Sequence, residues 1–111
     1  MGIFRMYTGP DGQSHVEEQT LETHPALTKP QAAKLIVFAQ QPDGTFLDWH
    51  PAPRRQYVIV VSGQVEIGFG DGTVRRFGPG QARLVEDTTG KGHTTRYIGP
   101  GPVITATIPL V

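Results

Sequence analysis

The segment Trp49–Gly63, WHPAPRRQYVIVVSG, combines several side chains that could do chemistry in one stretch. It opens with an aromatic–imidazole pair, continues through two arginines and Gln56, and ends in a β-branched run. Imidazole titrates near neutral pH and is the commonest metal ligand in proteins. A guanidinium can bind a carboxylate or phosphate through two parallel hydrogen bonds. The segment therefore predicts a small-molecule pocket, with His50 as a candidate metal ligand and Arg54 either guarding the pocket mouth or lying in solvent.

Three further histidines lie outside this segment. His93 follows a glycine-rich loop and begins a β-branched stretch, so a neighbouring strand could carry it towards His50. His15 lies in a polar stretch and faces the cavity only if that strand joins the wall; otherwise it is exposed. His24 precedes a proline and is expected in a loop. The sequence has no cysteine, which excludes disulfides, thiolate metal ligands and cysteine nucleophiles.

Length and charge limit the classes of protein that this chain can represent. The 111 residues are expected to form one domain, 1–111, with a single core. Lysine and arginine total 10, as do aspartate and glutamate, which argues against nucleic-acid or membrane-surface partners. No apolar run reaches the length of a signal peptide or a membrane span, so a cytoplasmic location is expected.

Fourteen glycines and ten prolines separate short β-branched runs, a pattern typical of an all-β sandwich or barrel. The chain alternates about ten such runs with turns, without a convincing long helix, which predicts antiparallel strands closing into a jelly roll. Gly9-Pro10-Asp11-Gly12 has the composition of a turn. Gly63-Gln64 and Asp71-Gly72 have the composition of hairpin loops. The apolar run at 33–40 favours a strand covered on both faces over the alternative of a short helix. The expected strands are 3–8, 14–21, 33–40, 45–49, 56–62, 65–69, 73–77, 82–86, 93–98 and 103–108.

The order of these residues resembles the two motifs of the cupin superfamily. In the first motif, His50 stands where the family has its first histidine, Ala52 at the second histidine and Gln56 at the glutamate. In the second motif, Gly80-Gln81 stands at a glycine–aspartate turn and His93 at the histidine that follows. The resemblance spans about 48–96. It implies a double-stranded β-helix, the jelly-roll barrel of RmlC-like cupins.

The resemblance also implies a metal site, with two of its four family ligands replaced. The remaining set is His50, Gln56 and His93, in which a neutral amide takes the place of a carboxylate. Such a set would hold a divalent ion weakly, with iron, manganese, zinc, nickel and copper as candidates. A ligand pocket built on this set would include Arg54 and His15 as well. The alternative is a metal-free polar pocket.

Two classes of function follow from this resemblance. The first is a small single-domain cupin of unassigned role that binds a small molecule in its barrel. The alternative is a metal-dependent cupin enzyme (a dioxygenase, isomerase or lyase) acting on a small polar or acidic substrate. A metal-free acid–base enzyme using His50 or His93 also stays open. Asp87 is expected to serve as a turn residue or as a carboxylate near the rim. Cupins commonly dimerise by exchanging or pairing terminal strands, so a homodimer is expected, for which the apolar Val103–Val111 tail and the polar N-terminal strand could serve.

Overall fold

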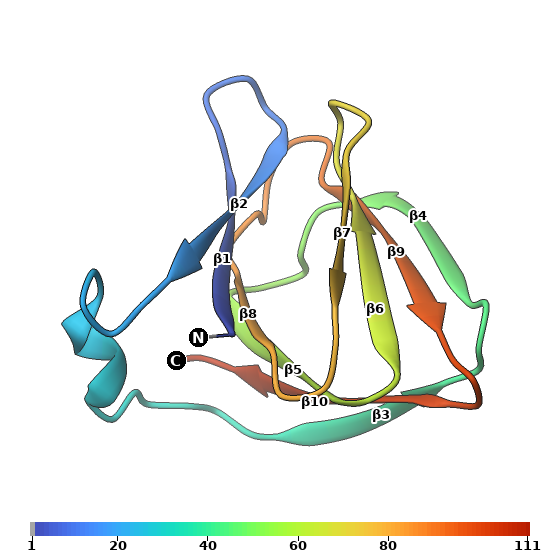
Figure 1. Ribbon diagram of the computed structural model, residues 1–111. Coiled ribbons are helices and arrows are strands. Elements are labelled where there is room, and N and C mark those ends of the chain that lie inside the picture. The colour runs from blue at the N-terminus through green and yellow to red at the C-terminus, as the bar shows by residue number, and fades with distance from the viewer. Residues whose placement is uncertain (1) are drawn as a thin grey trace.

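The computed structural model describes residues 2–111 as two β-sheets that face each other (Figure 1). One sheet has six strands in the order β2-β1-β8-β5-β10-β3, and the other has four in the order β4-β9-β6-β7. Among these described residues, the one helix is a 3-10 helix, η1, in the long connection between β2 and β3. The elements are β1 (Ile3–Thr8), β2 (Ser14–Gln19), η1 (Pro25–Thr28), β3 (Val37–Gln41), β4 (Phe46–His50), β5 (Gln56–Ser62), β6 (Gln64–Gly68), β7 (Val74–Phe77), β8 (Ala82–Val85), β9 (His93–Ile98) and β10 (Val103–Pro109).

Two hairpins form where the turn residues predicted them. β1 pairs with β2 across the Gly9–Gly12 turn, and β6 pairs with β7 across Asp71-Gly72. In the second turn, the backbone N–H of Thr73 donates to Asp71 Oδ1 at 2.9 Å, and Gly72 has φ +88°. The carboxylate thus stabilises the turn, and Gly72 adopts a positive φ without the steric strain that a side chain would cause.

Three expectations about the strands were wrong. Gly63 is not a hairpin loop, because β5 and β6 belong to different sheets and the glycine turns the chain between them. The topology is not wholly antiparallel, because β1 pairs in parallel with β8. β3 is not covered on both faces: it lies at the edge of the six-stranded sheet, with Val37 and Phe38 49% and 66% exposed.

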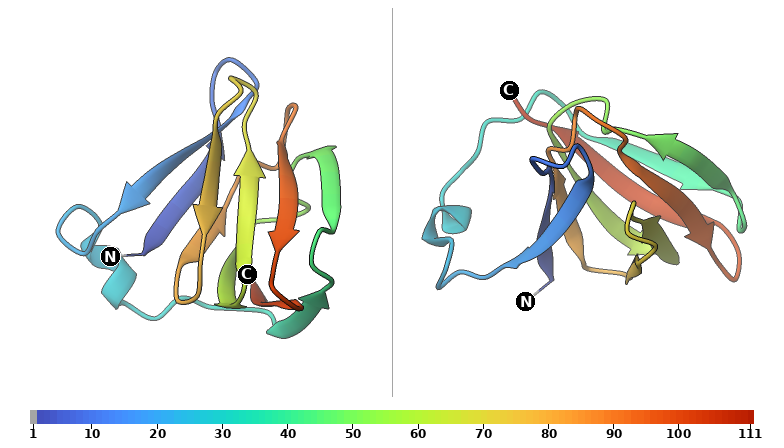
Figure 2. Two further views of the ribbon diagram at one scale, coloured as in Figure 1. Left: turned by 45° about the vertical axis from the view of Figure 1, so that its right-hand side comes forward. Right: turned by 90° about the horizontal axis from the view of Figure 1, so that it is seen from above.

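Connections between the sheets give the molecule its jelly-roll form. The turns after β3, β5, β7 and β9 all carry the chain from one sheet to the other. Seen from above, the two sheets lie face to face, and the connection bearing η1 runs outside them (Figure 2). This architecture confirms the expected all-β jelly-roll class.

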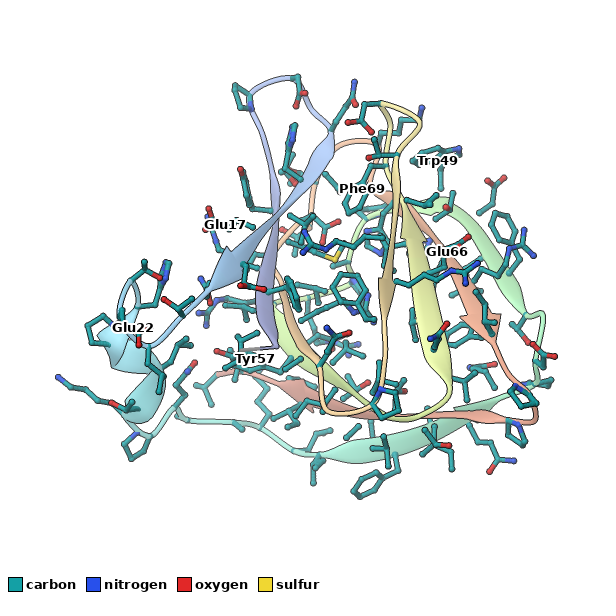
Figure 3. All side chains as sticks on the ribbon, in the orientation of Figure 1. Glu17, Glu22, Trp49, Tyr57, Glu66 and Phe69 are labelled. Carbon is teal, nitrogen blue, oxygen red and sulfur yellow. The ribbon has the colours of Figure 1, made fainter. Side chains whose placement is uncertain are left out.

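Side chains fill much of the space between the sheets (Figure 3). Alternating positions on the strands point inward, so both sheets contribute to one apolar cluster. Phe4 and Phe77 meet edge to face within it, with ring centroids 5.1 Å apart. The buried members are Phe4, Met6, Ala52, Val60, Val65, Ile67, Phe69, Phe77, Val85 and Val103.

The described residues include no helix long and apolar enough to cross a membrane.

Candidate functional site

A cavity of about 400 Å³ opens between the two sheets beside this core. Strand alternation builds its wall: residues two apart on one strand, such as Arg83 and Val85 on β8, both point inward. Gln56 and Val58 on β5 do the same. The lining residues are Ala39, Leu47, His50, Pro51, Ala52, Pro53, Gln56, Val58, Arg83, Val85, His93, Thr95, Tyr97, Thr105 and Thr107.

The two imidazoles expected from the sequence meet in this cavity. His50 at the end of β4 pairs with His93 at the start of β9, so the register of these strands brings them together. Their ring centroids are 4.8 Å apart and the ring planes are inclined by 59°. His93 is 4% exposed, whereas His50 is half-buried. The pair therefore presents one protected and one accessible ring to the cavity.

A backbone carbonyl fixes the tautomer of His50. Its Nδ1 lies 2.6 Å from the carbonyl oxygen of Asp48. A carbonyl oxygen can only accept a hydrogen bond, so Nδ1 carries the proton. In the neutral ring the lone pair is then on Nε2, where it can bind an ion or accept a proton.

A buried carboxylate positions His93 in a similar way. His93 Nδ1 lies 2.6 Å from Oδ2 of Asp87, which also accepts a hydrogen bond of 2.5 Å from the hydroxyl of Ser14. Asp87 is fully buried, so it is neither a simple turn residue nor a rim carboxylate. The Asp87–His93 contact orients the ring and leaves Nε2 as its second nitrogen for chemistry.

Gln56 and Arg54 interact with each other rather than acting separately on the cavity. Gln56 is buried in the wall, and its Oε1 accepts a hydrogen bond of 3.2 Å from Nη1 of Arg54. Arg54 itself is exposed and does not line the cavity, which corrects its expected place in the pocket. Because the positive guanidinium of Arg54 donates to this amide oxygen, the oxygen is a poorer ligand for a metal cation.

The donor set fits a metal ion only in part. The two imidazoles, each with a partner on Nδ1, have the arrangement of oriented metal ligands. Gln56 lines the same cavity, but its amide oxygen already accepts a hydrogen bond from Arg54. No group of three histidine, cysteine, aspartate or glutamate side chains suited to a metal occurs in the part of the chain that the structure describes. Two imidazoles and solvent would hold a borderline ion such as zinc or copper, and only weakly.

His15 lies away from this cavity, contrary to expectation. It lines a separate hollow beside the β1–β2 and β6–β7 turns, where its Nε2 lies 3.0 Å from both carboxylate oxygens of Asp11. Its ring stacks on Tyr7 at a centroid distance of 5.7 Å. β2 joins the sheet at its outer edge, so joining the wall does not bring His15 to the barrel interior.

Two ionisable residues of the cavity lining were missed from the sequence: Arg83 and Tyr97. Burial lowers the pKa of Arg83 to about 10, against the opposing fields of Tyr97 and Asp87. Burial likewise raises the pKa of Tyr97, and the charge on Arg83 opposes that shift. The strand pattern of Ala82–Val85 could have predicted that Arg83 points inward, because alternation places Arg83 on the same face as the apolar Val85.

Comparison with known proteins identifies the fold. No protein-family model matches the sequence, and no curated protein is similar to it. DMSP lyase DddQ from Ruegeria pomeroyi is similar in structure, with TM-score 0.54 and 20% identity over 68% of this chain. The chain spans only 37% of that lyase.

Two further crystal structures are similar over most of the barrel. An uncharacterized conserved protein with a double-stranded β-helix domain from Klebsiella pneumoniae has TM-score 0.52 and 22% identity, over 73% of this chain and 75% of its own. A conserved protein of unknown function from Streptococcus pyogenes has TM-score 0.50 and 18% identity, over 68% and 64%. By fold, then, this chain is a double-stranded β-helix, the jelly-roll barrel that the resemblance of its motifs predicted.

Proposed function

We propose that this protein binds a small molecule in the cavity between its sheets, with His50 and His93 contacting the ligand. The observation that carries the proposal is the imidazole pair: both rings line the cavity, and both use Nδ1 for internal hydrogen bonds. The cavity volume of about 400 Å³ lies within the range typical of small-molecule sites.

The proposal includes a weak divalent-metal site at the same two rings. His50 and His93 would hold the ion through Nε2, and Asp48 and Asp87 would keep the rings in the tautomer that a metal requires. When bound, such an ion supplies Lewis-acid chemistry to a ligand oxygen. Gln56 takes no part while Arg54 occupies its amide oxygen.

One observation favours an enzyme as a second candidate. The hydrogen-bonded Asp87–His93 pair resembles the base-and-orienter arrangement of general acid–base catalysis. In that role His93 Nε2 would remove or supply a proton at a bound substrate, while Asp87 holds the ring in place. The likeness to a lyase is a likeness of fold, and the same fold can carry unrelated activities.

The test combines elemental analysis with ligand mapping by ¹⁵N NMR. Protein purified without a metal-affinity column should contain less than one equivalent of metal and should take up Zn²⁺ at low affinity. His50→Ala should abolish that uptake, while His15→Ala, outside the cavity, should leave it unchanged.

A set of small polar molecules should shift backbone signals around His50, His93 and Val58. Shifts concentrated instead around His15 and Asp11 would place binding in the other hollow and contradict the proposal.

A further inference from the structure

Arg83 is a buried cation, and no side chain of opposite charge within residues 2–111 forms a salt bridge with it. The residue is 5% exposed, and its Nε makes no hydrogen bond. Its guanidinium lies over the ring of Phe77, whose centroid is 5.3 Å from the guanidinium carbon. Burial of such a group is strongly unfavourable unless hydrogen bonds or a counter-charge compensate it.

The position of Arg83 indicates where compensation could come from. Its side chain lines the same cavity as the two histidines but comes from β8 in the six-stranded sheet, whereas His50 and His93 come from the four-stranded sheet. A ligand in the cavity could therefore contact the guanidinium on one wall and the imidazoles on the other. The hydroxyls of Thr105 and Thr107 line the wall near β5 as well.

The charge of the lining limits the ligand further. Arg83 is the only lysine or arginine among the lining residues, and the lining includes no aspartate or glutamate. One fixed positive charge matches one negative charge, and a planar guanidinium matches a planar carboxylate through two hydrogen bonds. The apolar side chains of Leu47, Val58 and Val85 would contact a hydrocarbon body.

We propose that the cavity ligand is a small monocarboxylate and that Arg83 is its carboxylate-binding residue. The inference rests on the proposed function, because it assumes that this cavity binds a small molecule. It adds the chemical class of that molecule and a residue that the cupin motifs do not include. The bound carboxylate supplies the counter-charge that the protein itself does not bring to the Arg83 guanidinium.

The test observes the Arg83 Nε–H group directly by ¹⁵N NMR, with the signal assigned by its loss in Arg83→Met. Acetate and benzoate are the probes, at constant ionic strength with chloride as the balancing anion. Benzamide is the neutral control of the same shape as benzoate, and inorganic phosphate tests for a different anion. Acetate is small enough that the size of the cavity cannot prevent its entry.

Acetate and benzoate should shift the Nε–H signal in a saturable way, and benzamide should not. Arg83→Met should weaken benzoate binding by about 10- to 100-fold, the effect of a lost hydrogen bond to a charged group. Arg83→Lys keeps the positive charge but loses the planar guanidinium, so its affinity for benzoate should lie between those of the parent protein and Arg83→Met. Ligand-free Arg83→Met should unfold at a temperature no lower than the parent protein, because it removes an unpaired buried charge.

Several results would overturn the inference. Arg83 could instead pair with the unbonded Oδ1 of Asp87 through water; Arg83→Met would then destabilise the ligand-free protein, and neither acetate nor benzoate would move the signal. Equal binding of benzoate and benzamide would refute the carboxylate assignment while leaving the proposed cavity function intact. Tighter binding of phosphate than of benzoate would also overturn it. Failure of the proposed function would appear differently, as no response to any probe at His50, His93 and Val58.

Discussion

The environments of two histidines show how a single residue type acquires different roles in this molecule. His93 and His15 each contact one aspartate, at 2.6 Å and 3.0 Å. Asp87 is fully buried and receives a second hydrogen bond from Ser14, whereas Asp11 lies at an exposed turn. Water competes for an exposed pair and weakens it, but has no access to a buried one. Of these two histidines, only His93 therefore has an orientation fixed firmly enough for binding or proton transfer.

Asp87→Asn tests that difference at the residue scale. The amide keeps the size of the carboxylate but removes the charge that orients His93, so affinity for Zn²⁺ should fall by about 10-fold or more. Competition titration with a chelating dye measures the affinity. Asp11→Asn is the matched control, because it alters the other aspartate–histidine contact outside the cavity. An equal fall in both variants, or none in Asp87→Asn, would contradict the positioning role of Asp87.

The loop between β8 and β9 controls the histidine pair at the scale of elements. Gly92 precedes His93 and has φ +77°, and a Cβ there would overlap the carbonyl group of His50. The chain thus passes closely against the end of β4, which helps to bring the two imidazoles together. Glycine is required at this position both by its backbone conformation and by this close approach.

Gly92→Ala should therefore destabilise the protein and also disturb the cavity. Gly72→Ala is the matched control, since Gly72 has φ +88° but a Cβ added there would meet no atom within 4 Å. The control should cost about 1 kcal/mol for the positive φ alone. Gly92→Ala should cost more than this in urea unfolding and should weaken Zn²⁺ uptake. Equal losses of stability in the two variants would show that the approach to His50 is unimportant.

Glu86 links two elements to the same loop. Its carboxylate accepts hydrogen bonds of 2.6 Å from Arg5 on β1 and from Arg55 before β5. Burial raises the pKa of Glu86, but the hydrogen bonds from both arginines outweigh burial, so the net pKa lies below its usual value. A depressed folded-state pKa stabilises the protein above the unfolded pKa, and this stabilisation disappears as the pH falls through the folded value.

Glu86→Gln should accordingly lower the unfolding free energy by about 1 kcal/mol near neutral pH, the scale of partly exposed ion pairs. The difference between variant and parent should vanish in acid, once Glu86 of the parent is protonated. Urea unfolding across this pH range measures it. Glu66→Gln, which breaks a single pair with Arg76 on the four-stranded sheet, should lower the unfolding free energy by less. A difference that persists in acid would refute the electrostatic explanation.

Local signals predicted more of the structure than long-range ones. Turn chemistry identified the hairpins at Gly9–Gly12 and Asp71-Gly72, and motif spacing brought His50 and His93 together. The parallel pairing of β1 with β8 joins strands that are distant in sequence, so no local sequence pattern predicts it. Arg83 was missed because a charged residue suggests solvent, although its strand alternation places it inside.

At the scale of the whole molecule, the two edge strands of the six-stranded sheet differ in polarity. Val103–Val111 cannot serve as a free pairing strand, because β10 is paired on both sides, with β3 and β5. The open edges are β2, which is polar, and β3, which is apolar. Natural proteins usually protect an open edge with charge or proline. The segment from Leu35 to Phe38 carries neither and is about half or more exposed throughout.

The homodimer expected from the sequence stays a prediction, and β3 is the edge through which it would form. Two copies related by a two-fold axis could pair this strand antiparallel with itself and cover the apolar side chains of both. Sedimentation should give the mass of a dimer, and Phe38→Lys should give a monomer with an unchanged fold. Val74→Lys is the matched control, because Val74 is 61% exposed on β7, the edge of the other sheet, against 66% for Phe38. A monomeric parent protein, or equal dissociation by both variants, would rule out pairing through β3.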